Sequence, residues 1–153
     1  MIGILKNDIH NHKDQDIFAV ESLNRLAHTT TSACLFCDIV APDFIIPLRT
    51  TVLKRTHVFN FNGTVITDNI MRSQDLLYAS YAKKRFLYLY HLDWPYIKNI
   101  RFAYLEKVLL NKSIELIVRS STHYSLVKQL FKKPKYIMPE WDHEVLIEID
   151  NNE

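Results

Sequence analysis

The order of apolar and polar residues along the chain predicts strands that alternate with helices. Short apolar runs end in polar or ionisable residues, and segments with apolar residues at helical spacing follow them. Four such runs occupy the second half: Thr64–Thr67, Phe86–Tyr90, Ile114–Val118 and Tyr136–Met138. Strands that alternate with helices indicate a parallel sheet covered by helices.

The first half of the chain carries the same pattern less regularly. Ile2–Lys6 and Ala33–Val40 are apolar runs suited to strands, and His57–Phe61 alternates with the period of a short strand. Between the first two runs, we expect a polar loop and then a helix that Asp14 or Asp16 caps.

Further helices are expected between the later strands. One helix covers Ser73–Lys83 and another covers about Tyr96–Asn111. A third is capped by Ser120–Ser121 and stops before Pro134. Glu144–Ile149 fits an edge strand or a short helix, and the pattern does not decide between them. The third helix is expected to direct four apolar residues inward: Leu126, Val127, Leu130 and Phe131.

Length and composition narrow the fold and exclude some functions. A chain of 153 residues with 48% hydrophobic residues suits one domain with a sizeable core. We predict an α/β protein: a single Rossmann-like domain over residues 1–153, with a mainly parallel sheet of six to seven strands and helices on both faces. Gly3 and Gly63 are the only glycines, so no glycine-rich phosphate loop can form. This argues against dinucleotide-binding and P-loop classes.

Charge and hydropathy say little about partners. A net charge of +2 does not by itself predict nucleic-acid binding. The basic residues near Lys83–Arg85 and Lys128–Lys135 suit the carboxyl ends of helices, with a phosphate-binding or nucleic-acid-binding patch as the alternative. No apolar stretch approaches the roughly 18 residues of a membrane span, and we expect a cytoplasmic protein. Cys34 and Cys37 form a CxxC pattern inside a strand, where positions three apart face opposite sides, so we expect buried core cysteines.

The residues that follow the predicted strands are the candidates for a site. Parallel strands place their carboxyl ends at one edge of the sheet, and ligands of such sheets bind outside that edge. The residues there are Asn7, Asp8 and His10; Asp68 and Asn69; His91, Asp93 and Trp94; Arg119, Ser120 and Ser121; and Glu140, Trp141 and Asp142. This mixture can bind a polyol or a phosphate and can move protons. The alternative is that these are polar loop residues that cap helices.

Two groups at this edge have more definite chemistry. Arg119, Ser120 and Ser121 combine a guanidinium, two hydroxyls and a helix start, which suits an anion; an ordinary serine cap is the alternative. His91 lies two residues from Asp93 and is a candidate general base, with a surface loop as the alternative.

A third group alternates ligand-type residues within one loop. It contains Asp8, His10, His12, Asp14 and Asp16. Imidazole and carboxylate groups suit transition metals, but this spacing matches no established metal motif. We therefore expect a solvated loop and a helix cap, and no metal site.

The segment Thr64–Asp142 resembles the N-terminal Rossmann-like domain of two-domain (GT-B) glycosyltransferases. The similar stretches are TVITDN, YASYAKKRFLYLYHLDWPY and IELIVRSSTHYSLVKQLFKKPKYIMPEWD, which cover about half of the chain. The resemblance implies sugar transfer from a nucleotide donor, with the acceptor held by this domain and no other cofactor. By position, it implies His91 or Asp93 as the base and Arg119 and Ser120 as phosphate contacts. The other ligand-binding candidates are Asp8, His10, Asn69, Trp94, Ser121 and Glu140.

The resemblance also implies a partner. The family binds the donor nucleotide mainly in a second domain, which would begin near the end of this chain. We therefore expect a protein partner that supplies that domain. The alternative is a non-catalytic binding protein that uses exposed aromatic residues such as Trp94, Tyr96 and Trp141. The many Lys, Asn, Ile and Tyr residues indicate an AT-rich genome, such as that of a bacteriophage or a low-GC bacterium. Phages glycosylate their own DNA, so nucleic acid enters as a potential acceptor.

Overall fold

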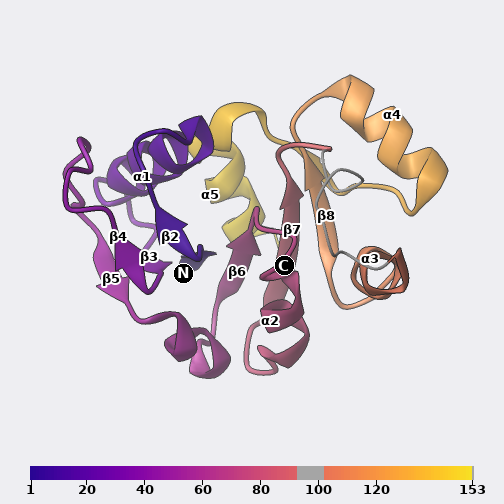
Figure 1. The fold of residues 1–153 in the computed structure, drawn as a ribbon, viewed down its shortest axis with the longest axis horizontal. Helices are drawn as coiled ribbons and strands as arrows, with labels where there is room; N and C mark the ends of the chain where they lie inside the picture. Colours follow the sequence, from indigo (N-terminus) through magenta and orange to yellow (C-terminus); the bar gives the residue numbers. More distant parts are fainter. Residues whose placement is uncertain (93–101, 153) are drawn as a thin grey trace.

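The sheet contains seven strands among the residues that the computed structural model describes, 1–92 and 102–152 (Figure 1). Their order is β5-β3-β1-β6-β7-β8-β9, and every pairing is parallel. The bounds are β1 (Ile2–Leu5), β3 (Ala33–Phe36), β5 (Thr51–Leu53), β6 (Thr64–Thr67), β7 (Lys84–Leu89), β8 (Glu115–Val118) and β9 (Tyr136–Ile137). The predicted α/β class and parallel sheet are confirmed.

The strand order defines where a ligand would bind. Numbered along the chain, the strands of this sheet stand in the order 3-2-1-4-5-6-7. Apart from the last strand, this is the order of the doubly wound Rossmann fold. The order reverses between β1 and β6, which pair with Ile4 beside Ile66. Ligands of open sheets bind outside the carboxyl ends of the strands at such a reversal, and this edge is therefore the place to examine.

Helices cover both faces because each strand buries alternate side chains on opposite sides. In β1, Ile2 and Ile4 belong to one buried cluster and Leu5 belongs to the other. Each fully buried side chain of this kind stabilises the fold by about 1.5–3 kcal/mol. One face is covered by α1 (Asp14–Leu26) and α5 (His143–Asn151), and the other by the 3-10 helix η1 (Arg55–Asn60), α2 (Ser73–Tyr78), α3 (Phe102–Leu109) and α4 (Ser121–Leu130).

The segment Glu144–Ile149, for which strand and helix were both open, is helical and belongs to α5. Asp142 caps this helix, since its side chain accepts a hydrogen bond from the backbone N–H of Glu144 at 2.9 Å. Leu146 and Ile149 are three residues apart and both buried against the sheet. That spacing is the one a helix needs to bury one side.

The predicted strand His57–Phe61 is wrong, because these residues belong to η1 and the turn after it. Val58 and Phe61 are three residues apart and both buried, which suits a helix with three residues per turn. The chain here crosses from β5 at the sheet edge to β6, and β6 already pairs with a strand on each side. A further strand would therefore have no neighbour in the sheet.

Two predicted helices differ from expectation in length or burial. α2 ends at Tyr78, earlier than predicted, because Ala79 leaves the helical conformation with a ψ of 64° and the chain turns toward β7. In α4, Val127 is buried, but Leu126 and Leu130 are 44% and 57% exposed. The expected inward position of these two leucines is wrong. α4 packs on β8 near the margin of the sheet, where little facing surface remains.

The connection between β1 and α1 is more ordered than a plain loop. Its residues Asp8–Ile9 form β2, which pairs in parallel with β4 (Ile39–Val40) in a small second sheet. Lys13 holds the cap position of α1 without a side-chain cap bond, and Asp14 and Asp16 lie inside the first turn. The predicted cap is therefore wrong, because Asp16 is drawn into the interior by other partners.

Candidate ligand-binding site

The candidate site lies at the carboxyl edge of β7, β8 and β9. Arg119 follows β8, Tyr90 follows β7, and Glu140 lies in the 3-10 helix η3 (Pro139–Trp141) after β9. Because the strands are parallel, their exits meet at this edge. His91 and Arg119 line one cavity there, and Arg119 and Glu140 line another.

Arg119, Glu140 and Tyr90 form a bonded cluster. The Nε of Arg119 donates to Oε1 of Glu140 at 3.0 Å, and a second guanidinium nitrogen donates to the same oxygen. The hydroxyl of Tyr90 donates to Oε2 of Glu140. The guanidinium carbon of Arg119 lies 4.5 Å from the centre of the Tyr90 ring, within range of a cation–π interaction. Each of the three side chains therefore orients the other two.

The contacts within this cluster set its charges. Partial burial works to raise the pKa of Glu140, but hydrogen bonds from Tyr90 and Arg119 outweigh it and the pKa is lowered. The pKa of Arg119 is raised, first by its hydrogen bond to Glu140. Burial raises the pKa of Tyr90, and the bond to Glu140 adds to that rise. At neutral pH the cluster thus contains one cation, one anion and a neutral phenol.

The backbone at Glu140 and Trp141 is unusual. Both residues have positive φ values, 47° and 57°, a conformation that costs a non-glycine residue roughly 1 kcal/mol or more. The side chain of Trp141 is fully buried, and its ring centre lies 5.0 Å from that of Tyr88. The hydroxyl of Ser22 donates to the carbonyl of Trp141. These contacts hold Glu140 in position, and they contradict the prediction that Trp141 is an exposed aromatic.

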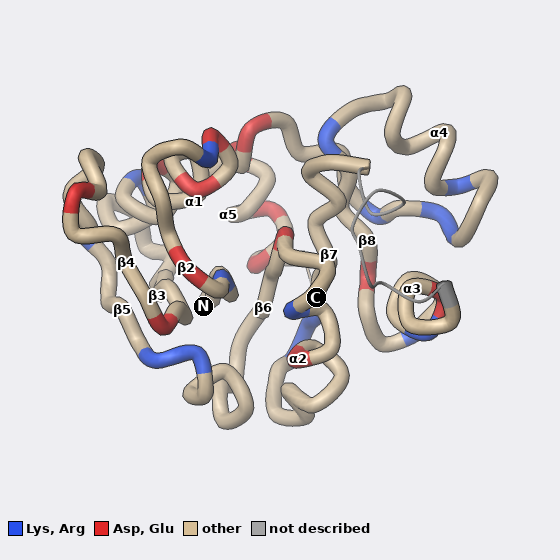
Figure 2. Tube along the Cα trace, viewed as in Figure 1, with Lys and Arg blue, Asp and Glu red and all other residues tan. Residues whose placement is uncertain are grey.

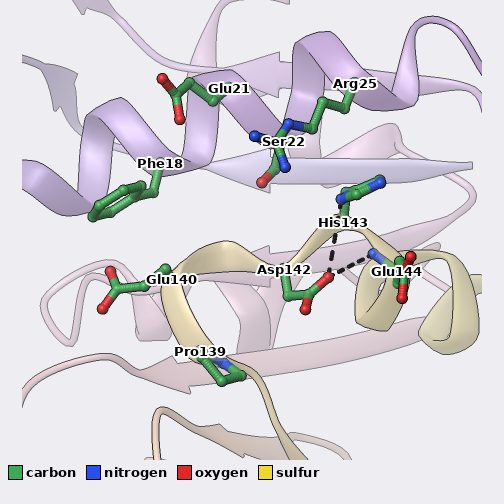
Figure 3. A pocket seen from close by; sticks show the side chains of 9 residues that line it. All are labelled: Phe18, Glu21, Ser22, Arg25, Pro139, Glu140, Asp142, His143 and Glu144. Atoms are coloured by element: carbon green, nitrogen blue, oxygen red, sulfur yellow. Dashed lines mark hydrogen bonds and ion pairs between the residues drawn. The ribbon is translucent and has the colours of Figure 1, made fainter.

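Among the residues that the structure describes, three cavities lie around the cluster. The first, of about 350 Å³, lies between the start of α1 and Arg119, with Tyr90 and His91 in its wall. The second, of about 570 Å³, is bounded by Arg119, Glu140 and the start of α4. The third, of about 420 Å³, lies between α1 and the start of α5 (Figure 3). In Figure 3 the Glu140 side chain points away from Asp142 and His143. Arg119 therefore separates the first two cavities, and Glu140 lies between the last two.

The two serines after Arg119 form the start of α4. Ser120 is its N-cap and accepts a hydrogen bond from the backbone N–H of His123 at 3.2 Å. Ser121 is the first helical residue and is exposed. The cap that was the alternative to anion binding is therefore present, although both serines also line the second cavity. Burial and the nearby Arg119 lower the pKa of His123, so this imidazole is neutral at neutral pH.

A buried ion cluster fills the point where the strand order reverses. Lys6 follows β1, Asp68 follows β6 and Asp16 comes from α1; each side chain is at most 2% exposed. The ammonium of Lys6 donates to Asp16 at 2.9 Å and also to Asp68. Burial raises the pKa of Asp68. Because these side chains occupy the reversal point, a ligand at this edge is directed toward β7 and β8.

Asp8 and His10 form a separate pair near the start of α1. Nε2 of His10 lies 2.6 Å from Oδ2 of Asp8, and Asn7 donates to the other carboxylate oxygen at 2.9 Å. Partial burial works to raise the pKa of Asp8, but the hydrogen bonds from His10 and Asn7 and the nearby charges together outweigh it, and the pKa is lowered. The backbone N–H of His10 donates to Asp16 at 3.1 Å. Among the described residues, no group of three or more histidine, cysteine or acidic side chains is placed to hold a metal ion.

The other predicted site residues are distributed differently. His91 is exposed, and its ring centre lies 4.8 Å from that of Tyr90. Asp93 and Trp94 lie outside the described residues, so the predicted pairing of Asp93 with His91 stays a prediction. The side chain of Asn69 accepts a hydrogen bond from the backbone of the same turn, at Met71, and is not among the residues that line the three cavities.

Sequence reasoning missed the role of Tyr90. The signal was present in the strand FLYLY, where Tyr88 and Tyr90 fall on the same side at alternate positions. The hydroxyl of Tyr88 donates to the carbonyl of Met138, and that of Tyr90 donates to Glu140. The two tyrosines therefore attach the end of β7 to the segment that follows β9.

Several basic residues are committed to structural contacts. Lys84 donates to the carbonyls of Ile149 and Asp150, at 2.8 and 3.2 Å, at the carboxyl end of α5. Lys132 donates to the carbonyl of Asn111 at 2.6 Å, and Arg85 donates to a carbonyl of α2 at 3.2 Å. Basic and acidic segments are mixed over most of the trace, whereas α4 and its exit carry basic residues (Figure 2). Arg85 thus contacts α2, the helix that precedes it, whereas Lys84 contacts the end of a different helix, α5.

Comparisons of the chain with protein-family models, curated proteins and solved structures gave no significant match. The resemblance to glycosyltransferases therefore stays a prediction from sequence patterns. None of the helices in the described part of the chain has both the length and the apolar character needed to cross a bilayer.

Proposed function

We propose that this chain is a glycosyltransferase-like protein that binds a nucleotide sugar at the carboxyl edge beside Arg119. The observation that carries the proposal is a guanidinium in the wall of two cavities, at the ligand-binding edge of a sheet with Rossmann strand order. Guanidinium groups recognise phosphates through paired, charge-assisted hydrogen bonds. The cavity volumes of about 350 and 570 Å³ match those of small-molecule sites, which span roughly 300–1,000 Å³.

The residues at this edge suit the roles that transfer of a sugar requires. In that reaction an acceptor hydroxyl gives its proton to a base, and its oxygen bonds to the anomeric carbon. The bond from that carbon to phosphate breaks, and the nucleotide leaves with the electron pair. Arg119 is the proposed contact for the leaving phosphate, and His91, which lines the same cavity, is the proposed base, with Asp93 as its predicted partner. His10 is the second base candidate, because its Nε2 lies 2.6 Å from Asp8, a carboxylate that can orient the ring.

Binding is the direct test, since the resembling family places the donor nucleotide mainly in a second domain. Purified protein would be titrated by calorimetry with UDP-glucose, UDP-galactose and GDP-mannose, alongside Arg119→Gln and Arg49→Gln. Arg49 is an exposed arginine outside the three cavities and serves as the matched control. We expect Arg119→Gln to weaken binding at least about tenfold, as loss of a charge-assisted hydrogen bond does. Absence of binding by the unmodified protein to any nucleotide sugar would refute the proposal.

A second candidate function is a non-catalytic interaction protein. The observation that favours it is a pair of apolar side chains one turn apart on α4, Leu126 and Leu130, which are 44% and 57% exposed. Large exposed apolar side chains close together mark interaction surfaces. The test is the sedimentation of the protein over a concentration series, beside the double variant Leu126→Glu and Leu130→Glu. A self-association that this double variant abolishes supports the candidate, whereas a monomer at every concentration removes this support.

A further inference from the structure

We propose that Glu140 is a built-in competitor for the anion site, whose carboxylate occupies Arg119 until a ligand diphosphate replaces it. This inference rests on the proposed function, because it concerns how the same site is controlled. The ligand class is a diphosphate, such as the one that joins a nucleoside to a sugar.

The first support is the geometry of the guanidinium. Its Nε and one terminal nitrogen both donate to Oε1 of Glu140, the Nε at 3.0 Å. These donors lie side by side and are the ones through which arginine makes paired hydrogen bonds to phosphate. Glu140 thus occupies the two N–H donors of Arg119 that a diphosphate would need. Arg119 lines both neighbouring cavities, so a ligand in either one could reach these donors.

The second support is that the pair is accessible to a competitor. The side chains of Arg119 and Glu140 are 36% and 38% exposed. Ion pairs with this exposure contribute little, because water and salt screen them. A diphosphate carries more negative charge than one carboxylate, and its oxygens can accept two parallel hydrogen bonds from the guanidinium. Exchange of Glu140 for a diphosphate is therefore favourable once the ligand enters the cavity.

The third support is the backbone that presents the carboxylate. Glu140 and Trp141 both adopt positive φ values, at 47° and 57°, which an ordinary turn does not need. Such a conformation persists only where surrounding contacts hold it. Trp141 is fixed by full burial, whereas Glu140 is held by its bonds to Arg119 and Tyr90. When a ligand takes Arg119, the Glu140 carboxylate keeps only its bond from Tyr90, and its side chain is free to turn away while the contacts of Trp141 hold the backbone.

The experiment measures diphosphate affinity when the competitor is weakened. Inorganic pyrophosphate would be titrated by calorimetry into the unmodified protein, Glu140→Gln, Tyr90→Phe and the control Glu144→Gln. Glu144 is an exposed carboxylate four residues from Glu140 that does not contact Arg119. Glu140→Gln keeps the shape and removes the charge. Tyr90→Phe keeps the ring beneath Arg119 and removes the hydroxyl that holds Glu140.

We expect Glu140→Gln to bind pyrophosphate about threefold to fivefold more tightly, since loss of a charged, exposed competitor frees a guanidinium for the ligand. Tyr90→Phe should bind roughly twofold to threefold more tightly, because it removes one of the three hydrogen bonds that the Glu140 carboxylate accepts. The control should match the unmodified protein. If that protein binds pyrophosphate and neither variant binds more tightly, the inference is wrong and the proposed function stands. If no protein binds pyrophosphate or a nucleotide sugar, both are wrong. Tyr90→Phe decides the question if Glu140→Gln does not fold.

Discussion

Lys6 and Asp16 form a buried ion pair at 2.9 Å, directly at the point where the strand order of the sheet reverses. Asp68 shares the same ammonium from the end of β6. In a Rossmann fold this point is the usual place of a ligand, and here three side chains of the protein occupy it. The pair also fixes the start of α1, because Asp16 accepts a hydrogen bond from the backbone of His10 at 3.1 Å.

The first prediction concerns this buried ammonium. Lys6→Ala leaves Asp16 and Asp68 buried without their cation, a loss that costs about 3–5 kcal/mol in other proteins. We expect the free energy of unfolding to fall by about that amount, measured by urea denaturation. Lys13→Ala is the control, because Lys13 is a partly exposed lysine 3.9 Å from Asp8, and such pairs contribute less than about 1 kcal/mol. Equal effects of the two variants would contradict the role assigned to Lys6.

The second prediction concerns the pH dependence of Glu140. Its pKa in the folded chain is below the ordinary value of 4.5, because bonds from Tyr90 and Arg119 outweigh the effect of burial. The folded chain thus keeps the carboxylate charged at pH values where the unfolded chain takes up a proton. The charged Glu140 carboxylate therefore adds to the free energy of unfolding above pH 4.5. This contribution is lost as the pH falls through the lower pKa of Glu140 in the folded chain.

Carboxyl carbon NMR checks this assignment. In the unmodified protein, the Glu140 signal should titrate with a pKa below the ordinary glutamate value of 4.5. In Arg119→Gln the bonds from the guanidinium are gone while burial remains, so the pKa should rise. An unchanged Glu140 titration in that variant would show that Arg119 does not hold this carboxylate charged. His91, which also lowers the pKa of Glu140 through its charge, is replaced in His91→Gln as a comparison and should give a smaller rise.

The third prediction concerns the two cysteines. Cys34 and Cys37 are buried in opposite clusters of the core and are free thiols, which confirms the expectation from their spacing in a strand. Burial raises the pKa of each to about 11, and thiolate is the reactive form. We expect neither thiol to react with iodoacetamide at pH 8 in the folded protein, and both to react in denaturant, as seen by mass spectrometry. Rapid labelling of either cysteine in the folded protein would contradict this burial.

The sequence predicts the sheet well because its information is local. Apolar runs such as Ile114–Val118 and the polar residues after them mark strands and their exits, and parallel exits necessarily share an edge. The error at His57–Phe61 has the same origin. Alternation over five residues resembles a strand, and the local pattern contains nothing about the position of β5. Because β5 lies at the sheet edge, the chain returns from there to β6 through a 3-10 helix.

The details of the site depend on distant pairs, which one sequence does not reveal. Lysine is seldom fully buried, so nothing in the sequence marks Lys6 as an interior residue. The left-handed conformation at Glu140 and Trp141 lacks the glycine that usually signals it. Tyr90 and Glu140 are 50 residues apart in the chain, and only the folded sheet brings them together.

The fourth prediction concerns the buried indole that supports Glu140. Trp141 is fully buried, and its Nε1 has no hydrogen-bond partner among the described residues. Trp141→Ala removes a large core side chain and should lower the free energy of unfolding by about 3–5 kcal/mol. Trp141→Phe leaves an aromatic ring beside Tyr88 and also removes the unpaired donor, whose burial costs about 1–3 kcal/mol. The phenylalanine variant should therefore lose much less stability than the alanine variant. Urea denaturation measures both, and equal losses would contradict the stabilising role of the ring packed against Tyr88, because both variants lack the indole N–H.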